Sequence, residues 1–178
     1  RIGAPIVTPF KGKGLIPDSH PNAGGVLGRS GTPIASWFMN EADLIVALGS
    51  SFANHTGIDR SKPIIQVDFE RMQLGTFHPV ALPVWGEIGA FCKAITPHLS
   101  DAADNVDQIA ELGERWSIWR AEKQTRISED QGKGVHSAAI FQTLTQLCPA
   151  DAIIACDVGN NTYSFGRYFE TQGQRVLM

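Results

Sequence analysis

Short apolar segments that end in glycine or in a polar side chain recur along this chain, with helical patterns between them. The segments cover residues 4–8, 43–48, 62–68, 81–85 and 152–156. Strand-like segments that alternate with helices are typical of a parallel sheet covered by helices. Residues 43–48 are apolar on both faces, which predicts a central strand of that sheet. The fold class is therefore predicted to be α/β with a parallel sheet.

Helix signals lie between the apolar segments. Thr32 followed by Pro33 predicts a helix start, because a threonine side chain caps free amides and proline is favoured at the first helical position. This helix is expected to run to about Glu41. Further helices are expected over residues 87–99, 137–147 and 163–169, whereas the glycine-rich segment 20–31 is predicted to be mostly irregular.

Residues 100–134 differ from the rest of the chain because they are polar and poor in strand formers. Trp116 and Trp119 lie one helical turn apart there, which predicts a helical linker that packs through both rings. A second unit is expected from about His136, with one strand and two helices, too few elements to bury a core alone. The strand over residues 4–8 also has no preceding βα unit, so we predict that the chain is a fragment.

The composition excludes several classes of protein. The chain has 178 residues, 43% hydrophobic and 19% charged, which is ordinary for a globular protein. A formal net charge of -3 with scattered Lys and Arg argues against nucleic acid as the main partner. No apolar run is long enough to span a membrane, and no export signal is visible. Cys92, Cys148 and Cys156 form no CxxC pair, so neither a disulfide framework nor a zinc site is predicted, and a cytoplasmic location is expected.

The strand tips are the candidate site, because ligands of open α/β sheets bind beyond the carboxyl ends of strands. The tips of interest are Gly49-Ser50-Ser51, Asp68-Phe69-Glu70 and Asp157-Val158-Gly159-Asn160-Asn161. Glycine lets a backbone approach a phosphate closely, and an acid at a strand tip can accept hydrogen bonds from ribose hydroxyls. Each tip has a plainer alternative: a Gly-Ser-Ser turn, an Asp68 cap of the next helix, and an Asn-Asn turn.

Other residues carry weaker signals. No GxGxxG, P-loop or GxSxG motif is present. The histidines show no metal-ligand spacing, and His20 and His78, which precede prolines, are expected in turns. Lys11 and Lys13 could bind an anion, but a solvated loop is the expectation for both. The residues alone therefore indicate a sheet whose tips are compatible with a nucleotide, and no acid–base machinery.

An ordered set of phrases along nearly the whole chain resembles the thiamine-diphosphate-dependent enzymes of the pyruvate oxidase and acetolactate synthase group. The phrases are Pro5-Ile-Val-Thr8, Gly12-Lys-Gly14 with Pro17 and His20-Pro21, Gly28-Arg-Ser-Gly-Thr-Pro33, Glu41-Ala-Asp-Leu-Ile-Val-Ala-Leu-Gly49, Ile65-Gln-Val-Asp68 and Asp151-Ala-Ile-Ile-Ala-Cys-Asp-Val-Gly159. The resemblance implies a Rossmann-like central domain over residues 1–99, lacking its first strand and helix. It also implies a helical linker over residues 100–135 and the start of a pyrophosphate-binding domain over residues 136–178.

The resemblance also implies cofactors. Gly159, Asn160 and Asn161 match the segment that contacts the diphosphate of thiamine diphosphate in such enzymes. The family's Mg²⁺ motif, Gly-Asp-Gly with a later Asn, and its catalytic glutamate have no counterpart in this sequence, so no catalytic residue and no metal ligand is assigned. The intact enzyme would be a homodimer or homotetramer acting on pyruvate or a similar 2-oxo acid. The isolated chain is expected to be inactive.

Several members of the family bind FAD or ADP in the central domain. Gly28 and Arg29, Gly49 and Ser50, and Asp68 match by position the segments that line that groove. Flavin-binding members often have Met-His where this chain has Arg29-Ser30, and Arg where it has Ser51, so FAD is left open.

Two rivals to the enzyme hypothesis are kept. A non-catalytic nucleotide-binding module would bind FAD or ADP without affinity for thiamine diphosphate, and a purely structural oligomerisation domain would bind neither. Within the enzyme hypothesis, acetolactate synthase-like carboligation and pyruvate oxidase-like oxidation are both open.

Overall fold

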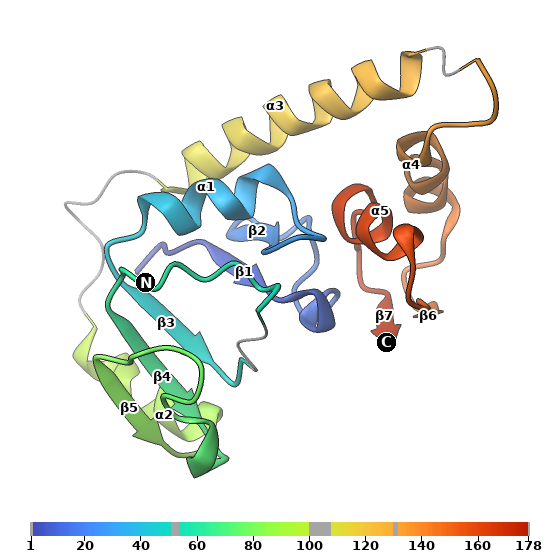
Figure 1. Cartoon of the computed structure of the whole chain (residues 1–178). Helices are drawn as coiled ribbons and strands as arrows, with labels where there is room; N and C mark the ends of the chain where they lie inside the picture. The colour runs from blue at the N-terminus through green and yellow to red at the C-terminus, as the bar shows by residue number, and fades with distance from the viewer. Residues whose placement is uncertain (1, 51–53, 100–107, 130–131, 178) are drawn as a thin grey trace.

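The computed structural model describes residues 2–50, 54–99, 108–129 and 132–177 (Figure 1). The strands are β1 (Ile6–Thr8), β2 (Ala23–Val26), β3 (Ile45–Leu48), β4 (Ile64–Asp68), β5 (Leu82–Trp85), β6 (Ile153–Ala155) and β7 (Arg175–Leu177). The α-helices are α1 (Pro33–Glu41), α2 (Ile88–Ile95), α3 (Gln108–Ser128), α4 (Ser137–Leu147) and α5 (Asn160–Tyr168). Short 3₁₀ turns lie between them: η1 (Phe10–Gly12), η2 (Arg71–Gln73) and η3 (Thr96–His98).

The strand pairs of the described residues are all parallel and form three small sheets. β1 pairs with β2, β3, β4 and β5 form a sheet in that order, and β6 pairs with β7. Parallel strands that alternate with helices confirm the predicted α/β class. The prediction of a central strand over residues 43–48 is wrong for the described residues, because β3 lies at an edge of its sheet.

The glycine-rich segment 20–31, predicted to be irregular, contains the strand β2. All four residues of β2 are buried. A Cβ at Gly24 would lie 2.9 Å from Val7 Cγ1, and a Cβ at Gly25 would lie 2.9 Å from Thr32 Oγ1. Val7 and Thr32 approach this strand so closely that only glycine fits at positions 24 and 25. Because glycine is not a typical strand former, the sequence pattern did not reveal β2.

Helix α1 has the predicted bounds. Thr32 Oγ1 accepts a hydrogen bond from the Ala35 N–H at 3.3 Å, and Pro33 is the first helical residue. The threonine side chain pairs one free N–H of the first helical turn, and proline has no N–H that would need a partner. The start of the helix is therefore stabilised by local residues. This local chemistry explains why the boundary could be read from the sequence.

One face of α1 covers strands of two different sheets. Ala35 and Met39 pack with Leu27, and Val7 of β1 and Ile45 of β3 lie against the same cluster. The helix therefore holds the two-stranded and the three-stranded sheets side by side.

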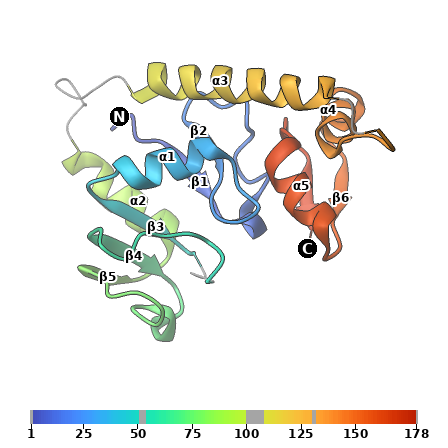
Figure 2. The same ribbon diagram turned by 45° about the horizontal axis from the view of Figure 1, so that its top comes forward.

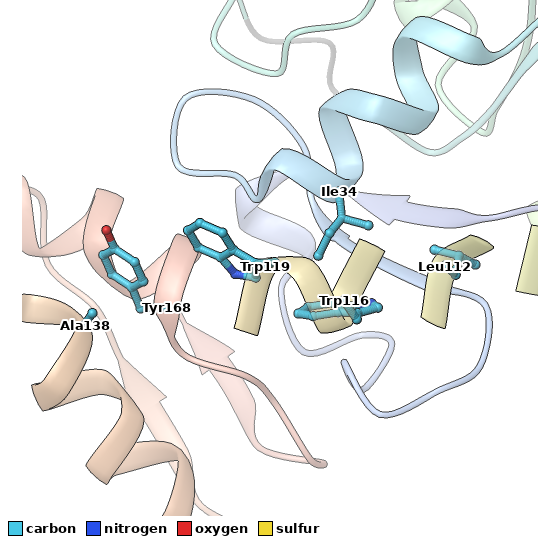
Figure 3. Packing of buried hydrophobic residues seen from close by; sticks show 6 residues of the cluster. All are labelled: Ile34, Leu112, Trp116, Trp119, Ala138 and Tyr168. Atoms are coloured by element: carbon cyan, nitrogen blue, oxygen red, sulfur yellow. The ribbon is translucent and has the colours of Figure 1, made fainter. Parts of the chain in front are cut away.

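The long helix α3 runs across the molecule from α1 to the C-terminal helices (Figures 1 and 2). Trp116 and Trp119 are 6% and 2% exposed, so the predicted packing of both rings is confirmed. Trp116 Nε1 donates to the Ala23 carbonyl at 2.7 Å, and the Trp119 ring stacks on Tyr168 with a centroid distance of 5.8 Å. Figure 3 shows one row of buried side chains: Leu112, Ile34, Trp116, Trp119, Tyr168 and Ala138.

The C-terminal unit contains a strand that the sequence analysis missed. β7 pairs with β6, whereas one strand was expected. Helix α4 has its predicted bounds, but α5 begins at Asn160 rather than near Tyr163. Gly159 occupies the cap position, so Asn160 and Asn161 form the first helical turn. β7 is only three residues long and its partner is distant in sequence, which leaves no local pattern.

A buried ion pair ties the loop after β1 to the C-terminal unit. Lys13 Nζ lies 3.3 Å from Asp18 Oδ2, and these side chains are 3% and 7% exposed. The same carboxylate oxygen accepts from the Thr171 N–H at 2.7 Å and from its hydroxyl at 3.0 Å. The expectation of a solvated loop is therefore wrong for Lys13. Burial lowers the pKa of Lys13, and the charge of Asp18 opposes that effect.

Glu170 provides a second polar tie, between the end of α5 and α3. Its carboxylate accepts from Arg120 Nη2 at 2.8 Å and from Lys123 Nζ at 2.5 Å. Burial by itself raises the pKa of Glu170. The hydrogen bonds and charges of Arg120 and Lys123 outweigh burial, and the net pKa lies below the ordinary value.

We predict that Trp119→Ala lowers the free energy of unfolding by about 3–5 kcal/mol, because it empties a buried ring position in the row of Figure 3. The matched control is Ile118→Ala, at a neighbouring position that is 52% exposed, for which we expect a change of about 0.5 kcal/mol. Urea unfolding followed by circular dichroism measures both. Equal losses for the two variants would contradict the role given to the aromatic row.

We predict that acidification destabilises the chain through Glu170. A carboxyl whose pKa is lowered by folding contributes stability that is complete above its unfolded pKa and is lost as the pH falls through its folded pKa. The loss should therefore begin as the pH falls below the ordinary value of 4.5. Urea unfolding at a series of pH values should show a shallower acid dependence for Glu170→Gln. Glu122→Gln, whose side chain is 47% exposed, is the control and should keep the parent's dependence.

Candidate functional site

The loops that follow β2 and β3 lie in direct backbone contact. Gly28 has φ +101°, a region that favours glycine. The Arg29 N–H donates to the His55 carbonyl at 3.2 Å, and a Cβ on Gly28 would lie 2.1 Å from that oxygen. Only glycine leaves room for this contact at position 28. The contact joins residues 28–31 and 54–57 into one continuous surface at the strand tips.

The other predicted groove residues lie at the tips of the three-stranded sheet. Gly49 follows β3, and a Cβ on it would lie 2.8 Å from Ile88 Cδ1. Asp68 Oδ1 accepts the Glu70 N–H at 2.8 Å within a turn, whereas Glu70 occupies the cap position of the following η2 without a side-chain cap bond. The alternative that Asp68 caps the next helix is therefore wrong. Ser50 is half-buried. Ser51, the last residue of the predicted Gly49-Ser50-Ser51 tip, lies outside the described residues.

Helix α5 packs directly on the loop after β2. Arg167 Nε donates to the Gly31 carbonyl at 3.2 Å, and Arg167 Nη2 donates to the Arg29 carbonyl at 3.3 Å. A Cβ on Gly166 would lie 2.3 Å from the Ser30 carbonyl oxygen. Sequence reasoning missed Arg167 because no motif surrounds it and its partners are more than a hundred positions away. The structure thus joins the predicted residues Gly28 and Arg29 to the C-terminal unit.

A cavity of about 210 Å³ opens beside this contact. Its walls are the loop 28–31, the first turn of α1, and the side chains of Trp119, Glu122, Arg126 and Arg167. Arg126 Nη1 donates to the Tyr168 hydroxyl at 2.8 Å, and this bond raises the pKa of Arg126. Arg126 also pairs with the Glu122 carboxylate, so the lining holds two cationic side chains and one anionic side chain and suits a polar ligand.

The second predicted site is the turn between β6 and α5. Gly159 has φ 156° and ψ -174°, a backbone conformation that side chains rarely adopt. A Cβ there would lie 2.6 Å from Asn161 Oδ1. The Thr162 hydroxyl donates to the Asp157 carbonyl at 2.7 Å and holds the turn. The start of α5 is thus bordered by a position that lacks a side chain, a cradle that fits a phosphate group.

The two candidate sites lie at opposite ends of α5. Arg167 contacts the loop 28–31 near the C-terminal end of the helix, whereas Gly159 precedes its N-terminal end. At a helical rise of 1.5 Å per residue, positions 160 and 167 are separated by about 10 Å. The sites are therefore separate, but one short helix connects them.

The described residues of both candidate sites carry hydrogen-bond donors that can bind a ligand. In the described ranges, no cluster of three or more His, Cys, Asp and Glu side chains is placed to hold a metal ion. His20 Nδ1 accepts the Asn22 N–H in a turn, as expected, and His136 Nδ1 caps α4 through the Ala138 N–H. None of the helices in the part of the chain that the structure describes is long and apolar enough to cross a membrane. Backbone amides, asparagine amides and guanidinium groups can bind phosphates and orient them.

Comparisons with known proteins agree on one family. Residues 1–95 match a family model described as thiamine pyrophosphate enzyme, central domain. The chain is 28% identical to YdaP of Bacillus subtilis, named as a thiamine pyrophosphate-containing protein, over 96% of the chain and 29% of that protein. It is 26% identical to a sulfoacetaldehyde acetyltransferase of Rhodobacter capsulatus, over 90% of the chain and 32% of that enzyme. It is 25% identical to the acetolactate synthase isozyme 3 large subunit of Escherichia coli, over 94% of the chain and 30% of that subunit. The chain thus spans about a third of the length of these relatives.

We predict that Gly28→Ala destabilises the chain by at least about 2 kcal/mol, because the new Cβ meets the His55 carbonyl at a positive φ. Gly113→Ala is the control, since a Cβ in that position of α3 meets nothing within 4 Å. Alanine in a helix interior should raise stability by about 0.5–1 kcal/mol. Thermal unfolding of both variants measures the difference. A neutral Gly28→Ala would show that the two loops do not need their close contact.

Proposed function

This chain belongs to the thiamine pyrophosphate enzyme family, and on that premise we propose that it is part of a longer enzyme that uses thiamine diphosphate and Mg²⁺ to decarboxylate pyruvate or a similar 2-oxo acid. The observation that carries the proposal is the match of residues 1–95 to the central-domain model. Relatives named acetolactate synthase and sulfoacetaldehyde acetyltransferase support an enzyme of this family.

We assign three parts to the chain. Residues 1–99 form the central domain, residues 100–135 a helical linker, and residues 136–178 the start of the pyrophosphate-binding domain. The family match over residues 1–95 supports the first assignment, and the helix α3 supports the second. The paired strands β6 and β7 with α4 and α5 support a distinct third part.

We assign the turn before α5 to the diphosphate of thiamine diphosphate. The free N–H groups at the start of α5 and the side-chain amides of Asn160 and Asn161 donate to phosphate oxygens, and Gly159 leaves the space that the diphosphate needs. The bound cofactor supplies the electron sink for decarboxylation. The residues of this chain bind and orient it, and they include none that we assign to catalysis or to Mg²⁺. We therefore expect the 178-residue chain alone to be inactive.

A second nucleotide, FAD or ADP, is proposed for the groove at the strand tips. Gly28, Arg29, Gly49, Ser50 and Asp68 would line it. The contact between residues 28–31 and 54–57 supports this groove, because it brings two tips from different sheets together. The cavity beside the loop 28–31 adds room for a polar group.

For the reaction type we propose one favoured reaction and one alternative. Carboligation of the acetolactate synthase type is favoured by the names of the relatives, and oxidation of the pyruvate oxidase type is the alternative. The longer enzyme is proposed to be a cytoplasmic homodimer or homotetramer.

The second candidate function is a non-catalytic nucleotide-binding module. The observation that favours it is that both sites, as far as the structure describes them, consist of binding groups. Such a module would bind FAD or ADP without thiamine diphosphate, and a purely structural oligomerisation domain would bind neither.

The coding sequence on both sides of this chain is the first test. A downstream Gly-Asp-Gly with a later Asn, together with an upstream pyrimidine domain that carries a glutamate, supports the enzyme. A stop codon directly after Met178 contradicts it and favours the nucleotide-binding module.

We predict that Asn161→Ala weakens the binding of thiamine diphosphate to the longer polypeptide by about 10- to 100-fold, which corresponds to one hydrogen bond to a charged group. Isothermal titration calorimetry with Mg²⁺ present measures the Kd. The control is Gln146→Ala, an exposed position on α4, and it should leave the Kd unchanged. An unchanged Kd for Asn161→Ala would remove this turn from the cofactor site.

A further inference from the structure

We propose that Arg167 is a positioning residue of the groove at the strand tips, and that its guanidinium holds the backbone of residues 29–31 in the form that binds a second nucleotide. The residues assigned above to that groove all lie in the proposed central domain, so Arg167 adds the C-terminal unit to the site. This role rests on the proposed FAD or ADP groove and makes its affinity depend on helix α5.

The first observation is that one guanidinium binds two carbonyls of the same loop. Arg167 Nε donates to the Gly31 carbonyl at 3.2 Å, and Arg167 Nη2 donates to the Arg29 carbonyl at 3.3 Å. The donors of an arginine lie in one rigid plane, so a pair of bonds from that plane fixes the orientation of both peptide groups. A lysine ammonium at the same place could not reproduce this planar pair of bonds.

The peptide plane transmits this constraint to the other side of the loop. The peptide bonds of the described residues are trans, and in a trans peptide the carbonyl and the N–H point in opposite directions. Because the Arg29 carbonyl is directed at Arg167, the Ser30 N–H in the same plane is directed away from α5. A backbone N–H is a suitable donor to a phosphate oxygen. Arg167 thus sets the direction of one donor that a nucleotide phosphate can use.

The second observation is that the backbone of α5 touches this loop directly. Helix α5 lies beside the segment between β2 and α1 (Figures 1 and 2). A Cβ on Gly166 would lie 2.3 Å from the Ser30 carbonyl oxygen and 2.9 Å from Phe10 Cε2. Glycine weakens a helix interior relative to alanine, but this close approach leaves no room for a larger residue. The glycine next to Arg167 therefore lets the guanidinium reach both carbonyls.

The third observation is that the loop is held from two sides. The Arg29 N–H donates to the His55 carbonyl at 3.2 Å, whereas the Arg29 carbonyl accepts from Arg167. Loss of the Arg167 side chain would release one side and leave the contact with His55 in place. We therefore expect a local loosening of the loop rather than its collapse.

The charge of Arg167 also suits this role. In the described part of the cavity wall, Glu122 pairs with Arg126, whereas the bonds of Arg167 go to uncharged carbonyls. These bonds leave the positive charge of Arg167 uncancelled beside the loop. A positive charge there favours an anionic nucleotide over a neutral ligand.

Nucleotide binding by the longer polypeptide is the main test. We expect Arg167→Ala to raise the Kd of the nucleotide that the parent binds, FAD or ADP, by about 10-fold, which corresponds to one charge-assisted hydrogen bond. The Kd of thiamine diphosphate should change by less than about 2-fold, because the turn before α5 is at the other end of the helix. Methylguanidinium added to Arg167→Ala should restore most of the nucleotide affinity. Isothermal titration calorimetry measures each Kd.

Two further variants separate geometry from charge. Arg167→Lys keeps the charge but not the planar pair of donors, so it should lose nearly as much nucleotide affinity as Arg167→Ala. Full affinity of Arg167→Lys overturns the positioning role, because charge alone would then suffice. Arg175→Ala is the matched control, an exposed arginine on β7 of the same unit, and it should leave both Kd values unchanged.

The remaining outcomes are distinguishable. Unchanged nucleotide affinity of Arg167→Ala overturns this inference and leaves the proposed groove intact. Equal losses of affinity for nucleotide and thiamine diphosphate overturn it as well, since Arg167 would then hold the C-terminal unit as a whole. A parent that binds neither FAD nor ADP removes the proposed groove and this inference together.

Residue-resolved amide hydrogen exchange gives a measurement that needs no nucleotide. The Arg29 N–H should exchange about 10-fold faster in Arg167→Ala than in the parent, because its loop is then held from one side. The Ile45 N–H, which donates to the Pro63 carbonyl at 3.0 Å, is the internal control and should not change. Unchanged exchange at Arg29 would show that Arg167 does not position the loop.

Discussion

The burial of the aromatic row along α3 is the interaction on which the rest of this structure depends. Trp116 fixes α3 to β2 through its indole N–H, and Trp119 fixes the same helix to α5 by stacking on Tyr168. Over residues 132–177 the C-terminal unit has two short strands and two helices. Its buried side chains need this contact because these elements offer little core of their own. Because α3 holds α5 in this position, Arg167 of α5 contacts the loop 28–31 and forms part of the first candidate site.

Polar contacts then decide how the parts are oriented. The Lys13–Asp18 pair and the carboxylate of Glu170 each reach across to another element, and both are largely removed from water. Buried pairs of this kind add little net stability, since desolvation offsets much of the attraction, but misplacing them leaves a charge unpaired. They therefore favour one arrangement of the C-terminal unit over others. In that arrangement the turn before α5, proposed for the diphosphate, and the loop 28–31, proposed for a second nucleotide, are separated by the length of one helix.

The helices and boundaries that could be predicted from the sequence are those set by residues close together in the chain. Thr32 and Pro33 start α1, and the bounds of α1 and α4 agreed with their local patterns. The strands missed by the analysis, β2 and β7, depend on distant partners: the glycines of β2 are required by the closeness of Val7 and Thr32, and β7 is defined only by pairing with β6. Helix α5 starts at Asn160 because Gly159 takes the cap conformation before it. The residue types Asn160 and Asn161 do not by themselves predict this start.

The sequence by itself determined the α/β class, the cap of α1, the glycines and amides at the strand tips, and the family to which the chain belongs, because each of these follows from residue type and spacing. Only the tertiary structure decided that β3 is an edge strand, that Lys13 is buried against Asp18, and that Arg167 closes on the loop 28–31. These features depend on residues far apart in the chain, whose proximity is settled by packing and by the cost of burying unpaired groups.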